Sequence, residues 1–401
     1  MISATARPYI DASVPVLREH GPTITLTFYR NMFAAHPELT NLFNMGNQAS
    51  GVQQQSLAAA VFAYAANIDN AAALAPVVKR IVHKHASVGI RAEHYPIVGF
   101  YLLDAIKEVL GDAATPPLID AWSEAYSELA GTLINAENGL YAEAAITPGQ
   151  LREMRVIDVS NESNSIKAIV MEAADGKPVP PFKPGQYVSV SVTFSDGSTQ
   201  LRQYSLSDAP YPNRLRISVQ RETKDDTQLN GRVSNWLHDN VSAGCSLHIS
   251  YPFGDFTPDV ESDAPIVLLS AGVGITPTIS VLNRIAEKYP ARHVVFGYAA
   301  RSKACQPHQG DIEVAKTKMP NLHVATFYED LPVDHENDGT IHKGRMDLAK
   351  LPQWDRTGTA VYLCGPVPFM QEQWRALLDA GVPANRLHRE VFGPELLNYL
   401  N

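Results

Sequence analysis

The chain has 401 residues, of which 45% are hydrophobic and 19% charged, as in a globular protein with two or three domains. Its formal net charge of -9 argues against nucleic acid or an anionic membrane surface as a partner. Three widely spaced cysteines argue against a disulfide framework, a zinc site or a cysteine-held cluster, so we expect a cytoplasmic protein. We also expect no secretory signal and no membrane span.

Residues 1–147 predict helices almost throughout, because apolar residues recur with the helical period. Turn signals predict where these helices break, at Gly21-Pro22, His36-Pro37, Gly46-Asn47, Asp69-Asn70, Gly89 and Pro116-Pro117.

Polar groups share apolar helix faces in this region. His85 follows Ile81 by four residues and precedes Val88 by three, which places it on an apolar stripe. The other polar residues on such faces are Tyr29, Gln53, Tyr95 and Glu137. A buried carboxylate is costly unless it is hydrogen-bonded, so the group suggests a tuned metal ligand with supporting residues. The alternative is an ordinary core histidine, with one or two of the faces misassigned.

Residues 150–260 change to the period of strands, with β-rich runs at 187–192 and 215–219 separated by Pro, Gly and Asn turns. This spacing predicts a small antiparallel barrel. Within it, Arg202-Gln203-Tyr204-Ser205 suits a flavin site, since Arg202 can meet a phosphate, Tyr204 can line the ring and Ser205 can bond its edge. An ordinary strand is an equal alternative for this tetrapeptide alone. The segment that starts at Gly231, with Val233 and Ser234, predicts a helix start whose N–H groups could hold a pyrophosphate.

Residues 262–401 alternate strand and helix patterns, which predicts a doubly wound α/β domain with a parallel sheet. The strand at 266–269 leads into Ala271-Gly272-Val273-Gly274-Ile275-Thr276-Pro277, a turn whose backbone N–H groups suit a dinucleotide pyrophosphate. Cys364-Gly365-Pro366 follows a later strand. Arg301 and Lys303 could meet a 2′-phosphate or be plain surface cations, so the choice between NADH and NADPH stays open.

These motifs, together with Tyr187 after Pro184-Gly185-Gln186, resemble the ferredoxin-reductase-like family. The resemblance implies FAD on the barrel and NAD(P)H on the α/β domain. It also implies that the Gly272 turn takes the dinucleotide pyrophosphate and that Cys364-Gly365-Pro366 borders the nicotinamide.

The helical third resembles a globin, and the whole chain resembles a flavohaemoglobin. The motifs that carry this are Asn44-Met45-Gly46-Asn47-Gln48 with Gln53, Lys84-His85, Tyr95, Ile134-Asn135-Ala136-Glu137 and Glu390-Val391-Phe392-Gly393-Pro394. We therefore expect a multidomain protein with an all-α globin haem domain (1–147), an antiparallel β-barrel FAD domain (150–260) and an α/β NAD(P) domain (262–401). The resemblance implies His85 as the iron ligand of haem b, and Glu390 with Phe392 beside the flavin. The loop 223–230 and the tail after Pro394 match less well.

In this family electrons pass from NAD(P)H to FAD and then to the haem, and nitric oxide is oxidised to nitrate by O2. Tyr29 and Gln53 would donate hydrogen bonds to bound O2. Tyr95 and Glu137 would bond the free nitrogen of His85 and make it a stronger electron donor. Lys84 could adjust the haem and flavin potentials, or be a solvated helix lysine.

Three other functions stay open: an O2 carrier or sensor with an attached reductase, a flavin or ferric reductase without haem, and a hydroperoxide reductase. The carboxylate of Glu137 argues against a simple O2 carrier. We expect a monomer. Lipid binding in the distal haem pocket, known in the family, is left open by this sequence.

Overall fold

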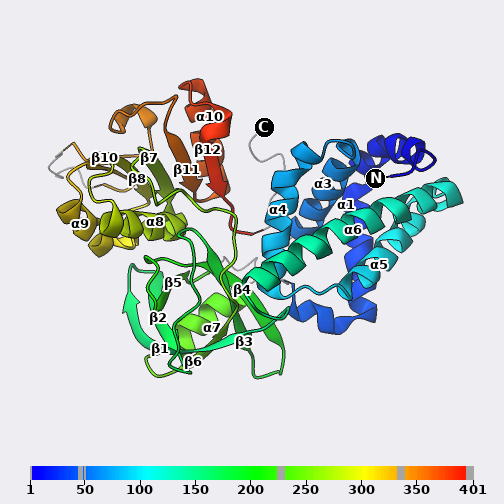
Figure 1. Cartoon of the computed structure of the whole chain (residues 1–401), viewed down its shortest axis with the longest axis horizontal. Helices are drawn as coiled ribbons and strands as arrows, with labels where there is room; N and C mark the ends of the chain where they lie inside the picture. Colours follow the sequence, from blue (N-terminus) through cyan, green and yellow to red (C-terminus); the bar gives the residue numbers. More distant parts are fainter. Residues whose placement is uncertain (1, 44–47, 49–50, 224–230, 332–338, 394–401) are drawn as a thin grey trace. The chain divides into compact units, whose positions relative to one another are not determined.

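A computed structural model describes residues 2–43, 48, 51–223, 231–331 and 339–393. The chain forms two compact units. The first contains Met1–Leu151 with Ser191–Arg202 and a C-terminal segment, and the second contains Arg152–Val190 and Gln203–Phe392 with the last residues. Figure 1 shows the helices of the first unit in blue to cyan and the strands of the two sheets in green to red.

The first unit is built from α-helices that share one core. Their bounds are α1 (Arg7–Ala35), α3 (Val52–Ala66), α4 (Ala71–Val88), α5 (His94–Leu110) and α6 (Pro116–Glu143). Helix α4 begins where the Asn70 side chain accepts a hydrogen bond from the backbone N–H of Ala73, and it ends at Gly89, whose φ is 78°. Helix α6 begins with prolines in its first turn, where the missing N–H groups cost least.

The predicted break at Gly21-Pro22 is wrong, because α1 continues through it. A proline inside a helix removes a hydrogen bond and crowds the preceding turn. Tertiary contacts outweigh that cost here. Helix α1 packs against α3 and α5, and a Cβ at Gly21 would lie 3.3 Å from the Cβ of Ala58 on α3. The Thr25 hydroxyl lies within hydrogen-bond distance of the Gly21 and Gln54 carbonyl oxygens, at 3.0 and 2.9 Å.

Six strands form the first sheet, in the order β4-β3-β6-β1-β2-β5. Their bounds are β1 (Arg152–Asn161), β2 (Ile166–Ala173), β3 (Tyr187–Thr193), β4 (Thr199–Ser205), β5 (Leu215–Gln220) and β6 (Ser246–Ile249). The pairs β1–β2, β1–β6 and β2–β5 are antiparallel, and helix α7 (Arg232–Asn240) follows β5. This confirms the antiparallel sheet expected from the period-2 runs.

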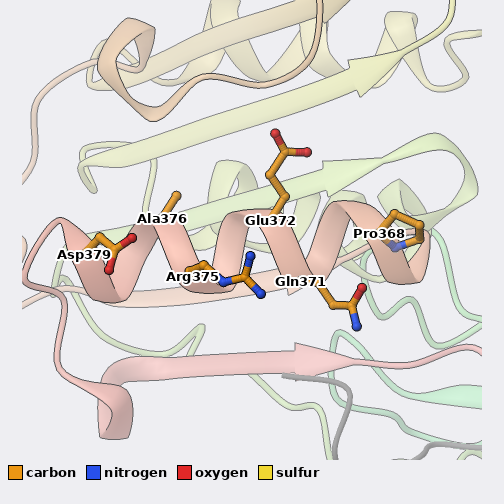
Figure 2. A pocket seen from close by; sticks show the side chains of 6 residues that line it. All are labelled: Pro368, Gln371, Glu372, Arg375, Ala376 and Asp379. Carbon is orange, nitrogen blue, oxygen red and sulfur yellow. The ribbon is translucent and has the colours of Figure 1, made fainter. Parts of the chain in front are cut away.

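The second sheet is parallel, in the order β10-β9-β8-β7-β11-β12. Its strands are β7 (Ile266–Ala271), β8 (Val294–Ala300), β9 (Leu322–Tyr328), β10 (Ile341–Lys343), β11 (Ala360–Cys364) and β12 (Leu387–Glu390). Its helices are α8 (Ile275–Lys288), α9 (Gln309–Lys318) and α10 (Val367–Asp379). Helix α10 carries a surface depression lined by Pro368, Gln371, Glu372, Arg375, Ala376 and Asp379 (Figure 2). None of these residues belongs to a predicted site.

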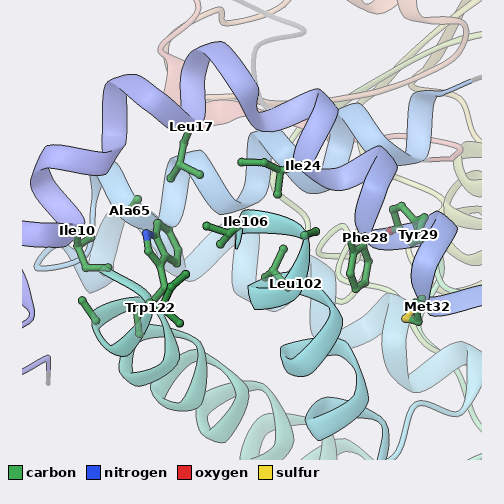
Figure 3. Packing of buried hydrophobic residues seen from close by; sticks show 14 of the residues in the cluster. Ile10, Leu17, Ile24, Phe28, Tyr29, Met32, Ala65, Leu102, Ile106 and Trp122 are labelled. Carbon is green, nitrogen blue, oxygen red and sulfur yellow. The ribbon is translucent and has the colours of Figure 1, made fainter. Parts of the chain in front are cut away.

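The core of the first unit lies between α1, α5 and α6. Figure 3 shows Ile10, Leu17 and Ile24 of α1 near Ile106 and Leu102 of α5 and Trp122 of α6. The Trp122 indole N–H donates to the Ser13 hydroxyl at 3.1 Å, so the largest core side chain has its polar atom satisfied. Within the described part of the chain, we find no helix with the length and apolar character to cross a membrane.

Helix α5 approaches α6 at Gly99, which suggests a packing test. A Cβ at Gly99 would lie 2.5 Å from the Tyr126 ring, whereas one at Gly139 on α6 meets no atom within 4 Å among the described residues. We predict that Gly99→Ala overpacks the core and lowers the thermal midpoint, measured by helical circular dichroism, by roughly 3–10 °C. Gly139→Ala should leave the midpoint unchanged or raise it slightly. An unchanged midpoint in Gly99→Ala would contradict this packing.

Candidate functional site

The histidine on the apolar stripe of α4 meets a buried carboxylate. His85 Nδ1 lies 2.8 Å from Glu137 Oε1 of α6, and the Tyr95 hydroxyl of α5 donates to the same oxygen at 2.5 Å. Glu137 is 2% exposed and Tyr95 7%, whereas the side chain of His85 is 35% exposed. Three helices thus bring together three residues that the sequence analysis selected.

The chemistry of Glu137 decides how His85 is protonated. A carboxylate only accepts hydrogen bonds, so Nδ1 of His85 is assigned the proton and donates it. The Tyr95 oxygen lies 3.1 Å from the same nitrogen. Because both contacts use Nδ1, the opposite nitrogen, Nε2, is the one that can bind a metal ion. Burial, the hydrogen bond to Glu137 and its negative charge raise the pKa of Tyr95 well above its usual value, so this hydroxyl stays a donor.

Two further tyrosines hold this arrangement, and the sequence analysis missed them. The Tyr126 hydroxyl donates to the Tyr95 carbonyl oxygen at 2.6 Å, and the Tyr141 hydroxyl to that of Ile90 at 2.8 Å. Both lie on α6 with Glu137. Only their position on the same helix as Glu137 could have indicated this role, because the carbonyl groups that they bond lie more than 30 residues away in the sequence.

A second polar pair lies on α1 and α3. Tyr29 is 5% exposed among the rings of Phe28, Phe33 and Phe43, with ring centroids 4.7–5.8 Å apart. Burial raises the pKa of Tyr29 to about 12, and a hydrogen bond with Gln53 opposes part of that rise. The hydroxyl is therefore protonated at neutral pH and can donate to a ligand.

Two other predicted residues of the first unit, Lys84 and Gln48, also have hydrogen-bond partners. Lys84 is half-buried beside His85 on α4. Gln48 lies near the start of α3, where its side-chain oxygen accepts from Gln54 Nε2 at 2.9 Å. The rest of the Asn44–Asn47 motif falls outside the described residues, as does Pro394.

The predicted flavin residues cluster around the end of β4. Arg202, Gln203, Tyr204 and Ser205 close this strand. The next N–H, of Leu206, donates to the Gln186 carbonyl at 2.9 Å, which brings the strand end beside the turn that precedes Tyr187. That turn needs Gly185, because its φ is 99° and a Cβ would lie 2.1 Å from the Phe256 carbonyl oxygen.

The predicted phosphate helix is α7, with Gly231 at its N-cap. A Cβ at Gly231 would lie 2.6 Å from Glu222 Cβ and from Ser234 Oγ. The Ser234 hydroxyl donates to the Gly231 carbonyl at 3.1 Å and accepts from the Glu222 N–H at 3.2 Å. This hydroxyl shapes the helix start, and Val233, which is 1% exposed, can offer only its backbone N–H.

The two predicted nicotinamide motifs come together at one edge of the parallel sheet. Ser270 of β7 pairs with Cys364 of β11, so both turns leave the same edge. A Cβ at Gly274 would lie 2.4 Å from the Cys364 carbonyl oxygen, so only glycine allows this approach. Gly272 has a φ of 55°, and among the described residues no atom lies within 4 Å of a Cβ placed there, which leaves room for a phosphate. Ala271, Val273, Ile275, Thr276 and Pro277 complete the turn and the first turn of α8.

Beyond Cys364 the chain reaches Gly365 and Pro366, the N-cap residue of α10, and the neighbouring strand β12 ends at Glu390. Burial and the negative charge of Glu390 raise the pKa of the Cys364 thiol well above its ordinary value, so it is not a nucleophile. Glu390 and Val391 are buried and precede Gly393, whereas Phe392 is 47% exposed and free to cover a flat ligand.

Two separate parts of the chain match models of known protein families. A globin family model matches residues 26–133, and an oxidoreductase NAD-binding domain model matches residues 268–374. The flavohemoprotein of Bordetella parapertussis is 47% identical, over 98% of this chain and 99% of its own. That of Rhizobium meliloti is 45% identical, over 99% of both chains. The chain belongs to the flavohemoprotein family.

Two solved structures extend the comparison. The flavohemoglobin of Malassezia yamatoensis, determined with bound FAD and heme, has a TM-score of 0.85 and 30% identity, over 98% of this chain and all of its own. The FAD/NAD-binding domain of the nitric oxide dioxygenase of Vibrio cholerae has a TM-score of 0.55 and 35% identity, over 61% of this chain and 99% of its own. The predicted fold class, a globin with a ferredoxin-reductase-like module, is confirmed.

The contact between the two nicotinamide turns generates a prediction. Gly274→Ala would push the Cys364–Pro366 turn away and misplace the dinucleotide, so we expect at least about 10-fold weaker NADH binding. Fluorescence titration of the purified protein measures this. Gly310→Ala is the matched control, since its Cβ meets no atom within 4 Å in the described residues. Equal NADH affinities for both variants would contradict the proposed role of the Gly274 turn.

Proposed function

We propose that this chain is a nitric oxide dioxygenase that uses reduced nicotinamide and O2 to convert nitric oxide to nitrate. The observation that carries the proposal is a histidine held by a buried carboxylate in a globin, in one chain with an FAD/NAD-type reductase. The haem supplies the iron that binds O2, and FAD converts two-electron delivery by NAD(P)H into single-electron steps. The relatives named above, one with bound FAD and heme, support this assignment.

His85 is the proposed iron ligand, through Nε2. The residues fit a haem, because Nδ1 is already bonded to Glu137 and the partly exposed side chain leaves Nε2 for the metal. The carboxylate fixes the orientation of the ring and draws the Nδ1 proton toward itself. The imidazole would thereby gain imidazolate character and supply more electron density to a bound iron, which would favour reduction of O2 over its simple storage.

Tyr29 and Gln53 are the proposed distal donors. A neutral hydroxyl and an amide N–H can both point partial positive charge at the outer oxygen of the O2 substrate. Tyr29 is buried among aromatic rings, so a hydrogen bond from its hydroxyl to O2 would form away from bulk water and be stronger than in water. This polarisation suits reaction with a radical such as nitric oxide.

The remaining site residues form the reductase. Arg202 is proposed to bind a flavin phosphate, Tyr187 and Tyr204 to line the ring, Gln203 and Ser205 to contact its edge, and the N–H groups from Gly231 to Ser234 to hold the pyrophosphate. The turn from Ala271 to Pro277 is proposed for the dinucleotide and Cys364-Gly365-Pro366 for the nicotinamide. The segment from Glu390 to Pro394 is proposed to border the flavin.

We propose domain boundaries at 1–147, 150–260 and 262–401, a monomeric protein and a cytoplasmic location. Lys84, beside the iron ligand, is proposed to adjust the haem and flavin potentials through its charge.

The direct test is nitrate formation. Nitrate forms from nitric oxide, O2 and one electron, and a reduced nicotinamide carries two, so we expect two nitrates for each NADH consumed. The assay compares NADH consumption in air with and without nitric oxide. Oxidation that nitric oxide does not accelerate, with no nitrate formed, would instead support an oxygen-binding globin or a flavin reductase.

Removal of the His85 side chain should reduce haem binding but leave the reductase activity. We predict that His85→Ala purifies with little haem, because the iron loses its protein bond, but still oxidises NADH with an artificial acceptor. His83→Ala, on another face of the same helix, should keep its haem. Haem content is read from the absorption spectrum, and full occupancy in His85→Ala would point to another ligand.

Loss of the distal hydroxyl should weaken O2 binding. We predict that Tyr29→Phe speeds O2 dissociation from the reduced protein by roughly 5-fold or more, since one hydrogen bond of about 1–1.5 kcal/mol disappears. Tyr64→Phe is the control, because that hydroxyl donates to the Ala125 carbonyl oxygen at 3.1 Å. Flash photolysis measures the rates. Equal rates in Tyr29→Phe and the unsubstituted protein would refute the distal role.

A further inference from the structure

A polar cluster, here called the junction cluster, joins the antiparallel-sheet part and the parallel-sheet part of the second unit. None of its members belongs to the proposed cofactor sites. Its members from the antiparallel part are Glu162, Ser207, Asp208, Arg216 and Ser218, and those from the parallel part are Ser280, Asn283, His308 and Asp311.

His308 is the centre of the cluster and is fully buried. Its Nε2 lies 3.0 Å from Ser218 Oγ and its Nδ1 2.8 Å from Asp311 Oδ2. Its backbone N–H donates to Glu162 Oε2 at 2.9 Å. The φ of His308 is 59°, a left-handed conformation that a histidine keeps only when its surroundings hold it there. Three bonds from different elements thus fix this residue.

The guanidinium of Arg216 faces two carboxylates of the cluster. Arg216 Nη2 donates to Asp311 Oδ2 at 3.0 Å and lies 3.8 Å from Asp208 Oδ1. Burial alone would raise the pKa of Asp311, but the hydrogen bond from His308 and the charge of Arg216 lower it to about 2. Asp311 is therefore ionised at neutral pH and accepts from both sides of the junction.

The cluster reaches both proposed cofactor sites by short paths. The Ser280 hydroxyl donates to the Asp208 carbonyl at 2.7 Å, and Asn283 Nδ2 donates to the carboxylates of Asp208 and Asp311 at 2.9 and 3.0 Å. Asp208 follows Ser205 of the flavin strand by three residues. Ser280 follows Thr276 of the dinucleotide turn by four residues, one turn of α8. The cluster is therefore connected to both sites through a few bonded residues.

Ser218, His308 and Asp311 have the contact order of a hydrolase triad, but burial gives them another role. Ser218 is 3% exposed and His308 is fully buried, so the hydroxyl is not open to a substrate. Buried polar groups that satisfy one another specify a single arrangement of the elements that carry them. The same geometry thus serves to fix two parts of the unit against each other.

We propose that His308, acting through Ser218 and Asp311, is a positioning residue that sets the approach of the nicotinamide to the flavin. The inference rests on the proposed electron route. In that route one hydride, which is two electrons with one proton, would pass from the reduced nicotinamide to the flavin, and its rate would fall steeply with small displacements. The junction cluster holds the two binding elements at a fixed separation.

The test uses the full-length holoprotein, with flavin reduction followed anaerobically after rapid mixing with NADH or NADH deuterated at C4. The variants are His308→Leu, which removes both side-chain bonds, and Ser218→Ala, which removes one. Ser218→Thr keeps the hydroxyl. His238→Leu is the matched control, because His238 is 8% exposed and bonds the Val219 carbonyl oxygen at 2.8 Å within the antiparallel part.

We expect the limiting rate of flavin reduction to fall about 10- to 100-fold in His308→Leu, with a larger deuterium isotope effect and an NADH dissociation constant changed by less than about 3-fold. Ser218→Ala should change the reduction rate and the isotope effect in the same direction but by less. Ser218→Thr and His238→Leu should resemble the unsubstituted protein. Hydrogen exchange without nucleotide should quicken in His308→Leu at peptides covering 206–209 and 278–284.

Three outcomes would overturn the proposal. Faster exchange with unchanged reduction rates and isotope effects would make the cluster a source of stability alone. An equal loss in His238→Leu would show a general packing effect. If His308→Leu does not fold, an unchanged rate in Ser218→Ala is decisive against the proposal. A flavin that NADH cannot reduce in the unsubstituted protein would instead refute the proposed function, and this inference with it.

Discussion

The candidate iron site is organised by one buried carboxylate, that of Glu137. Glu137 is almost fully removed from water, and this placement is tolerable only because His85 and Tyr95 both donate to it. The same hydrogen bond assigns the proton to Nδ1 of His85, orients the ring and leaves Nε2 for a metal. Stability and the proposed function therefore use one contact. The helices α4, α5 and α6 must pack as they do to satisfy the carboxylate, and the same packing would make His85 an electron-rich ligand for the proposed haem.

In the reductase part, the turns of the proposed cofactor sites are positioned by close contacts with the backbone rather than by hydrogen bonds between side chains. Gly274 packs against the Cys364 carbonyl, and Gly185 against that of Phe256, so two turns at each site lie nearer than any residue with a Cβ allows. The junction cluster then ties the elements that carry these turns. Glycine thus sets local distances, while buried hydrogen bonds set the distance between the two sites.

Local signals in the sequence predicted the kinds of secondary structure and the residues around His85. Helical and strand periods were sufficient for the three kinds of segment. His85, Tyr95 and Glu137 were each selected because they share the apolar face of their own helix, and burial repeats with the helical period. Prediction failed where a tertiary contact outweighed a local preference, as at Pro22, which α1 accommodates through its packing on α3 and α5. The roles of Tyr126 and Tyr141, and the whole junction cluster, were not predictable, because their partners are distant in sequence. Ser218 and His308, for example, are 90 residues apart.

The central claim, that the Glu137 carboxylate makes His85 an electron-rich iron ligand, is tested most directly by the iron–histidine stretching frequency. Resonance Raman spectra of the reduced, ligand-free protein would be compared with those of Glu137→Gln, which keeps the size of the side chain and removes its charge. We expect a high frequency in the unsubstituted protein and a clear downward shift in the variant, toward that of a neutral imidazole. Equal frequencies in the two proteins would contradict it.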